Sequence, residues 1–329
     1  MNTWMVRSGR GSAFFEQFKE LKNVGLGWRK IGNLAAISSR EELARNLSAQ
    51  YPEYPAQTVA MNTGQLFRFA KEIQLRDRVV TYDSESRIYL CGTIRGGYEH
   101  FPDESEEILV NRRDVDWQFE VYRDHLSQAA RNSLGSIATL FQISEAVSGE
   151  LWSKPTSPPM PDVLPTVPES AIETADSLLG KGKILIQDRV ATLDWEEMQS
   201  LVAGLLRGMG YKTTISPKGP DRGKDILASP DRFGFEEPRI VVEVKHRPGQ
   251  KMGSKEITSF LGGRHSADKG LYVSTGGFSQ EARYEAERAK IPLTLMDLEM
   301  LVDALLEHYP QFDEETKRLL PIKQLYWPI

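Results

Sequence analysis

The strongest constraint on the fold is a run of six prolines between residues 155 and 168. Proline fixes φ and lacks a backbone N–H, so neither a regular helix nor a central strand can pass through such a run. A segment of this composition is typical of a semi-rigid, partly extended spacer. The 329 residues leave enough chain on either side for two domains with separate cores. We therefore predict four parts: an N-terminal domain over 1–143, a linker over 144–190, a C-terminal domain over 191–308 and a tail over 309–329.

Composition excludes several classes of protein. Hydrophobic residues make up 40% of the chain and charged residues 26%, which is ordinary for a soluble globular protein. No stretch approaches the ~20 apolar residues that span a bilayer, and no apolar run of signal-peptide length follows the N-terminus. The single cysteine, Cys91, rules out an internal disulfide and argues against a zinc site built from cysteines. We expect a cytoplasmic protein without a membrane partner.

Residues 191–308 show the succession of helical and strand patterns that predicts a mixed sheet flanked by helices. Asp194 and Glu197 have the spacing of a capping box, and apolar residues then recur at helical spacing until Gly210. The segment 239–245 is a β-branched run typical of a strand. Further strands are expected over 211–215, 224–228, 270–275 and 292–296, and helices over 257–261, 279–290 and 298–307.

Three charged residues on two of these strands predict an active site. Glu243 and Lys245 are two positions apart in a strand, so their side chains point to the same face of the sheet. Asp225 precedes Glu243 by 18 residues, and a hairpin would bring the two carboxylates together. Such carboxylates repel each other unless a cation intervenes, and a hard ion such as Mg²⁺ suits oxygen ligands. Magnesium there can polarise a phosphodiester and acidify a bound water, while Lys245 can orient that water or stabilise charge on the phosphate.

A local positive patch overlaps these residues. The net charge of −5 excludes a protein that coats nucleic acid through bulk charge, so contact with DNA would need such a patch. Residues 245–255 contain four basic residues and one histidine but no acidic residue. A solvated loop is the alternative interpretation, but the patch begins inside the candidate active site, which favours phosphate contact. The expected phosphate ligands are His246, Arg247 and Lys251.

Four segments in order resemble the Mrr-like branch of the PD-(D/E)xK restriction endonucleases. They match the family's first helix, glycine-containing turn, catalytic strand and later strand, and they are Trp195–Tyr211, Gly219–Ile226, Glu243–His246 and Gly270–Phe278. The resemblance implies a restriction-endonuclease-like fold, a divalent metal and phosphodiester hydrolysis. Asp225, Glu243 and Lys245 match the catalytic positions, with the two carboxylates as metal ligands. Two positions depart from the family: Arg222 replaces a usual glycine of the turn, and Gln199 replaces a common glutamate of the first helix. In related sites that glutamate can help to hold a metal, so Gln199 leaves the number of metal ions open.

Residues 1–143 show short strand patterns around a few helices, which predicts a small β-barrel with helices. The expected strands are 3–7, 24–28, 78–83, 88–94 and 115–122, and the expected helices 40–49 and 62–71. Short motifs in this region resemble the PUA-like superfamily, nearest to its EVE-type members. They are Trp4–Gly9, Val24–Trp28, Gly64–Phe69, Asp77–Tyr82, Gly92–Tyr98 and Val115–Trp117.

The second resemblance implies a pocket for one flipped, often modified, base. Extruding a base costs a few kcal/mol, and stacking on aromatic side chains returns ~1–3 kcal/mol per base. Trp28, Tyr98 and Trp117 are the expected walls of that pocket. Arg7, Ser8 or Asn62 are candidate readers of the base edge. The alternative is that the aromatic residues fill a small core.

Taken together, these patterns predict a modification-dependent, type IV-like DNA endonuclease that defends against foreign DNA. Its partner is modified double-stranded DNA, its cofactor Mg²⁺, and its linker confines cutting to DNA near the recognised base. Cutting both strands requires two active sites, so we expect a homodimer at least on DNA. Two alternatives stay open: a nuclease gated by a nucleotide or RNA ligand of the N-terminal domain, and a catalytically inactive DNA-binding module. The apolar end of the tail, Leu325–Ile329, is expected to dock on a domain or a partner subunit.

Overall fold

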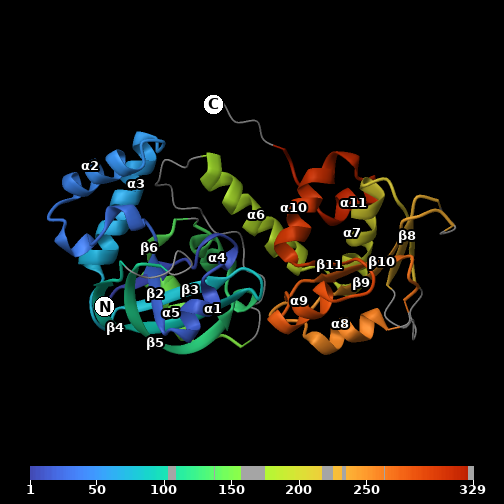
Figure 1. Cartoon of the computed structure of the whole chain (residues 1–329), viewed down its shortest axis with the longest axis horizontal. Coiled ribbons are helices and arrows are strands. Elements are labelled where there is room, and N and C mark those ends of the chain that lie inside the picture. The colour runs from blue at the N-terminus through green and yellow to red at the C-terminus, as the bar shows by residue number, and fades with distance from the viewer. Residues whose placement is uncertain are drawn as a thin grey trace. The chain divides into compact units, whose positions relative to one another are not determined.

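The computed structural model describes residues 1–102, 109–136, 138–156, 175–216, 225–231, 235–262 and 264–324. The chain forms two compact units (Figure 1). The first comprises Met1–Asp83 with Ile88–Ser170, and the second Ser84–Arg87 with Ala171–Ile329. The mixed α and β fold class and the two-part layout predicted from the sequence are confirmed. No helix among the described residues is long and apolar enough to span a bilayer.

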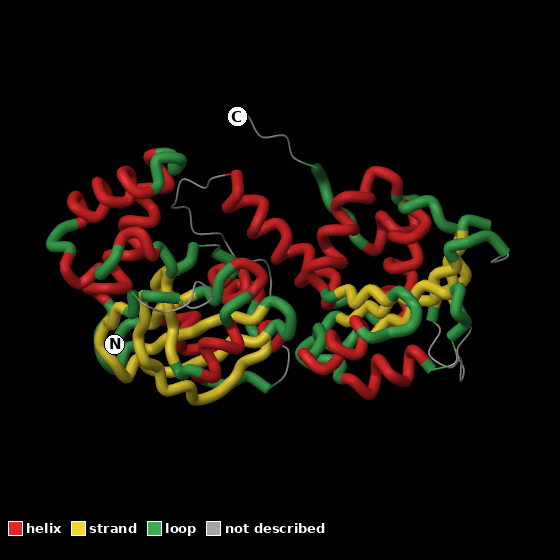
Figure 2. The backbone as a smooth tube through the Cα atoms, viewed as in Figure 1, coloured by secondary structure: helices red, strands yellow, loops and turns green. Residues whose placement is uncertain are grey.

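The first unit is built on one curved, six-stranded sheet (Figure 2). β1 and β3 run parallel, and all other neighbouring pairs are antiparallel. The order across the sheet is β2 (Asn23–Leu26), β5 (Asn111–Tyr122), β4 (Ile88–His100), β3 (Arg78–Asp83), β1 (Thr3–Val6) and β6 (Leu140–Ile143).

The curvature has a local cause in the long pair of β4 and β5. The register between them shifts at Cys91/Gly92 and again at Ile94/Tyr98, and such bulges bend a strand and increase its twist. A Cβ on Gly92 would lie 2.5 Å from the carbonyl oxygen of Asp116, so the first bulge needs a glycine. Among the described residues β2 and β6 are the edges of this sheet, so the predicted barrel is realised as a curved sheet with two edges.

Each face of this sheet buries its own core, as the two-residue period of strands requires. Trp4 and Val79 belong to one core, whereas the next residues along the same strands, Met5 and Val80, belong to the other. The first core also contains residues of three helices, α1 (Phe15–Glu20), α2 (Arg40–Gln50) and α3 (Ala56–Phe67). The second contains residues of α4 (Gln128–Leu134) and α5 (Glu145–Trp152).

Two helices occupy parts of the segment 144–190 that we expected to be linker. α5 buries Val147 and Leu151 in the second core of the first unit. α6 (Ala175–Ala191) is part of the second unit and continues past Gly180 and Gly182. Residues 157–174, with five of the six prolines, lie outside the described residues.

The second unit contains a five-stranded mixed sheet. β9, β10 and β11 are parallel neighbours, whereas β7, β8 and β9 form an antiparallel meander. The order across the sheet is β11 (Leu293–Met296), β10 (Asp268–Ser274), β9 (Arg239–Lys245), β8 (Ile226–Ser229) and β7 (Lys212–Ile215).

Helices cover both faces of this sheet (Figure 1). α7 (Trp195–Gly208) and α10 (Leu298–His308) bury their apolar faces with Val242 and Val244, in a core that α6 also joins. α8 (Ser254–Leu261) and α9 (Gln280–Glu287) pack on the other face, with Val241 and Tyr272. The capping box predicted at the start of α7 is present: the Asp194 carboxylate accepts from the N–H of Glu197, and the Glu197 carboxylate from that of Asp194.

The first part of the tail packs on the second unit. Phe312 and Leu320 are buried in the core beside α7 and α10, and α11 (Glu314–Leu319) lies between them in sequence. The hydroxyl of Tyr309 donates to the carbonyl of Leu320 at 3.0 Å. The last five residues, 325–329, for which we predicted docking, lie outside the described residues.

Candidate active site

Asp225, the residue before β8, is bonded to the part of β9 that carries Glu243. Ile226 pairs with Val242 in the antiparallel register, and the N–H of Asp225 also donates to the carbonyl of Val242, at 2.9 Å. Glu243 is the next residue of β9, and Lys245 lies two positions further, on the same face of the sheet. Asp225 and Glu243 are both 7% exposed. The structure therefore places Asp225 against Val242, the neighbour of Glu243 along the strand.

Main-chain and side-chain contacts fix these carboxylates. Oδ2 of Asp225 accepts a hydrogen bond from the N–H of Val244 at 2.7 Å. Oε1 of Glu243 lies 2.6 Å from Nζ of Lys245. A buried charge needs a partner, and Lys245 supplies it from a position that keeps 31% of its side chain exposed. Lys245 thus links a buried carboxylate to the solvent side of the site.

Tyr272 is a neighbour of this site that the sequence analysis did not identify. It stands opposite Glu243 in the parallel register of β9 and β10 and is fully buried. Burial and the nearby Glu243 carboxylate raise the pKa of the Tyr272 hydroxyl. Its hydroxyl has no hydrogen-bond partner among the described residues. Tyr272 lies in the family-like segment Gly270–Phe278, but no role at the site was predicted for it, because a tyrosine in an apolar strand has the same pattern as any core residue.

The end of β9 is tied to the turn after β10 and to the start of α7. The carbonyl of Lys245 accepts from the N–H of Thr275 at 3.1 Å. Nε2 of His246 lies 2.8 Å from the carbonyl oxygen of Leu193, and Nδ1 lies 3.1 Å from Oγ1 of Thr275. Both ring nitrogens of His246 therefore face protein atoms, so the imidazole holds the end of β9 in place.

The basic residues that follow β9 lie at different depths. Arg247 is exposed and Lys251 is half-buried. The N–H of Met252 donates to the carbonyl of Gly277 at 2.9 Å, so the loop after β9 runs beside the turn after β10. A Cβ on Gly276 would lie 2.4 Å from the carbonyl oxygen of Arg247, so these two segments approach closely only because position 276 is a glycine.

The donor set of this site fits Mg²⁺. Asp225 and Glu243 offer hard carboxylate oxygens, and the nearby His246 directs both ring nitrogens elsewhere. The described residues contain no group of three or more His, Cys, Asp or Glu side chains placed to hold a metal. Mg²⁺ needs no such cage, because it commonly uses one or two carboxylates and keeps several waters. Gln199, at the position where the family often has glutamate, is buried in α7.

The three aromatic residues expected to bind a base gather on one core of the first unit. Trp28, Tyr98 and Trp117 are all half-buried and pack against it. The Tyr98 hydroxyl donates to Oδ1 of Asn111 at 2.6 Å, and Nε1 of Trp117 donates to the carbonyl of Phe18 at 2.8 Å. These bonds fix two of the three rings at their polar edges.

The candidate edge readers have partners inside the first unit. The guanidinium of Arg7 donates to the carbonyl oxygens of Ser136 and Leu134. The Ser8 hydroxyl donates to the carbonyl of Tyr82 at 3.1 Å. Asn62 is buried in α3.

Two family models match the chain, one in each unit. Residues 190–305 match the model of the Mrr catalytic family, which is described as a restriction endonuclease. The C-terminal part of the chain carries a restriction endonuclease domain. Asp225, Glu243 and Lys245 all lie inside this domain. Residues 4–144 match a family described only as a domain of unknown function, DUF8426.

Individual relatives are distant. The chain is 32% identical over 98 residues to the uncharacterized protein y4cE of Sinorhizobium fredii (strain NBRC 101917 / NGR234), which covers 29% of this chain and 25% of that protein. The chain thus spans a quarter of that relative's length. Among solved structures, MspJI restriction endonuclease in complex with a 27-mer oligonucleotide is 13% identical, with a TM-score of 0.35, over 88% of this chain and 67% of that one. The DNA modification-dependent restriction endonuclease AspBHI is 13% identical, with a TM-score of 0.33, over 91% and 79%.

Proposed function

We propose that this protein is a modification-dependent DNA endonuclease that hydrolyses phosphodiesters with Mg²⁺. One observation carries the proposal: inside the restriction endonuclease domain, Asp225 is hydrogen-bonded to Val242 and Val244, the residues on either side of Glu243, whose carboxylate pairs with Lys245. A buried carboxylate pair beside a lysine is costly to keep unless it holds a cation.

In this proposal, the two carboxylates and the lysine have separate tasks. Asp225 and Glu243 hold Mg²⁺, which when bound polarises the phosphodiester and acidifies a water. Asp225 is kept in place by the N–H of Val244, so it binds without first reorganising. Lys245 neutralises Glu243 in the structure. Once that carboxylate serves as a ligand, the ammonium group orients the attacking water or stabilises charge on the phosphate.

Contacts to the DNA backbone come from the residues after β9. Arg247 is exposed beside the catalytic strand, which suits a phosphate contact, and Lys251 adds positive charge to the same loop. We assign His246 a different role from the one expected, because its two nitrogens already face Leu193 and Thr275. It keeps the strand end in place beside the phosphate.

The first unit supplies target selection as a PUA-like reader of a modified base in foreign DNA. Trp28, Tyr98 and Trp117 are half-buried around one core, so parts of their surfaces stay accessible. The hydrogen bonds of Tyr98 and Trp117 engage ring edges, whereas a base stacks on a ring face. Rings held at the edge form a rigid wall that loses little entropy on binding. Cutting of both strands then needs a second copy of the chain on the DNA.

Cleavage assays test the proposal against its rivals. The substrates are matched duplexes that differ only in one modified base, each incubated with Mg²⁺ or with EDTA. Mg²⁺-dependent cutting confined to a modified duplex supports the proposal. Cutting that starts only after addition of a nucleotide or RNA supports a ligand-gated nuclease. Metal-independent binding without any cutting contradicts the proposal and identifies an inactive binding module.

A further inference from the structure

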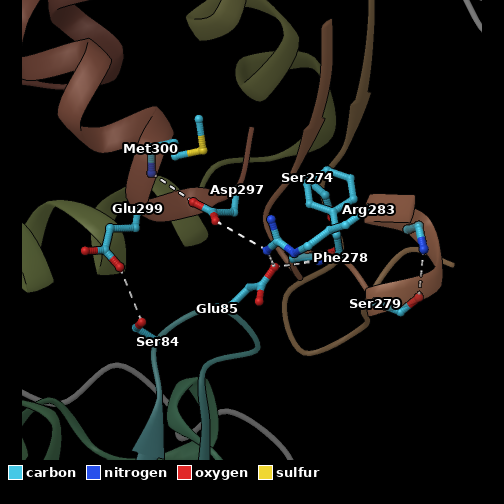
Figure 3. Close-up of polar contacts among 11 residues, drawn as sticks. Ser84, Glu85, Ser274, Phe278, Ser279, Arg283, Asp297, Glu299 and Met300 are labelled. Carbon is cyan, nitrogen blue, oxygen red and sulfur yellow. Dashed lines mark hydrogen bonds and ion pairs between the residues drawn. The ribbon is translucent and has the colours of Figure 1, made fainter. Parts of the chain in front are cut away.

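Four residues of the second unit come from the middle of the first unit's sequence. Ser84–Arg87 connect β3 to β4, yet they belong to the second unit. The β3–β4 ladder ends at the pair Asp83 and Ile88, so these four residues form the whole loop between the strands. We call Ser84–Arg87 the hairpin tip. Figure 3 shows the tip beside the turn after β10 and the start of α10.

Glu85 holds the turn after β10. Its Oε1 accepts hydrogen bonds from the N–H of Phe278 at 2.7 Å and from Nη2 of Arg283 at 2.6 Å (Figure 3). Gly277, with a φ of 77°, makes room for this contact, because a Cβ there would lie 2.0 Å from Cγ of Glu85. The close approach therefore depends on a glycine in a conformation that other residues rarely adopt.

Arg87 anchors the other end of the hairpin tip. Its side chain is fully buried, and Nη2 lies 2.7 Å from Oδ1 of Asp188 in α6. Asp188 is itself 5% exposed. Separating Arg87 from Asp188 would leave a buried charge without a partner, so the pair holds the hairpin tip against α6. The Ser84 hydroxyl adds a longer contact, 3.5 Å from Oε2 of Glu299.

The turn that Glu85 holds also holds the end of the catalytic strand. Thr275, three residues before Phe278, donates its N–H to the carbonyl of Lys245 and places Oγ1 3.1 Å from His246. A displacement of Phe278 is therefore passed through a short turn to the main chain of Lys245. Glu85 reaches the catalytic lysine by two hydrogen-bonded steps and one turn.

We propose that Glu85 is a positioning residue of the nuclease: from the hairpin tip it holds the turn after β10 and, through that turn, the end of the catalytic strand. This rests on the proposed function, because it takes Lys245 as a catalytic residue.

Three variants of the full chain test the proposal. Glu85→Ala removes the acceptor for the Phe278 N–H, Glu85→Gln keeps an acceptor but loses the ion pair with Arg283, and Ser84→Ala is the matched control in the same tip. The measurements are the single-turnover cleavage rate at saturating DNA, the dissociation constant for that DNA, and amide hydrogen exchange at Phe278 and Thr275.

We expect Glu85→Ala to lower the cleavage rate at least tenfold while DNA affinity changes less than about twofold, and to speed exchange at both amides. Glu85→Gln should keep the rate within about threefold of the parent, and Ser84→Ala within about twofold. A parent-like rate for Glu85→Ala, with faster exchange at Phe278, overturns the proposal. If the parent protein cuts no DNA, the proposed function fails, but hydrogen exchange at Thr275 still tests the role of Glu85. Faster exchange at Thr275 in Glu85→Ala, and in neither other variant, supports the positioning role. Unchanged exchange at Thr275 in Glu85→Ala overturns that role.

Discussion

One carboxylate oxygen of Asp225 accepts a hydrogen bond from the main-chain N–H of Val244, 2.7 Å away on the neighbouring strand. The bond ties Asp225, the residue before β8, to the residue that follows Glu243 in β9. It gives Asp225 a structural role besides the chemical one. A substitution at this position must therefore keep an acceptor for Val244 if it is to report on chemistry alone.

Asp225→Asn meets that requirement, because its amide oxygen can still accept from Val244. We expect this variant to keep the fold but lose cleavage by at least a hundredfold, since the negative charge that holds Mg²⁺ is gone. Lys245→Ala should lose as much without weakening metal binding. Single-turnover rates measure cleavage, titration calorimetry measures Mg²⁺ binding, and circular dichroism measures retention of the fold. Cleavage by either variant at near-parental rates would refute the mechanism, and EDTA should abolish cutting by the parent.

Arg87→Ala should destabilise the second unit by about 3–5 kcal/mol, because it leaves the buried Asp188 carboxylate without its guanidinium partner. Urea unfolding measures the change. Arg189→Ala, at the exposed neighbouring position of α6, is the control and should change stability by less than about 0.5 kcal/mol. The double variant with Asp188→Ala should cost less than the sum of the two single changes, since the partners interact. Additive effects would show that the pair contributes nothing as a pair.

Gly204→Ala tests the packing of α7 against α11. A Cβ on Gly204 would lie 2.1 Å from Oγ1 of Thr316, and that hydroxyl is held by Asp313 at 2.6 Å. We expect a loss of about 1–3 kcal/mol from overpacking, although alanine favours a helix over glycine. Gly149→Ala in α5 is the matched control, because nothing lies within 4 Å of its added methyl. That variant should gain about 0.5–1 kcal/mol in urea unfolding. A gain at both positions would contradict the packing of α11.

Asp313 should make stability depend on pH. Hydrogen bonds from Arg207 and Thr316 hold the pKa of the Asp313 carboxyl below its usual value of 3.8. A lowered folded-state pKa contributes stability above the unfolded value, and this stability is lost as the pH falls through the folded-state pKa. Asp313→Asn keeps an N-cap acceptor but loses the charge. Because the Asp313 side chain is 42% exposed, we expect a cost of only about 0.5–1 kcal/mol at pH 7.

The difference in unfolding free energy between the parent and Asp313→Asn should shrink as the pH falls below about 4, because the Asp313 carboxyl of the unfolded parent then takes up a proton while the folded one stays ionised. Urea unfolding at a series of pH values between 3 and 7 follows this change. A difference that stays constant over the whole range would show that the ion pair with Arg207 does not contribute to stability.

Much of the second unit could be predicted from local patterns. The strand 239–245 has the bounds of β9, and the capping box at Asp194 and Glu197 opens α7 as expected. The shared face of Glu243 and Lys245 follows from the two-residue period of any strand. Only the pairing with Asp225 needed a hairpin, and the turn residues before it supported that inference. These features succeed because each depends on residues close together in the chain.

Distant contacts explain what the sequence left undecided. The pattern of 144–190 predicted a linker, but Val147 and Leu151 of α5 find burial in the first unit and α6 is buried in part against the second. His246 had the pattern of a phosphate ligand, and only folding set its ring against Leu193 and Thr275. Neither the burial of these helices nor the contacts of His246 produces a periodic pattern in the sequence, because the partners are far apart along the chain.

The sequence by itself predicted the class of chemistry that we propose, since two carboxylates and a lysine on adjacent strands suit metal-dependent hydrolysis. The tertiary structure alone decided that Ser84–Arg87 belong to the second unit. Glu85 and Phe278 are 193 residues apart, and Arg87 and Asp188 are 101 apart. Contacts over such separations depend on the tertiary fold of the second unit, and no local propensity or periodicity records them.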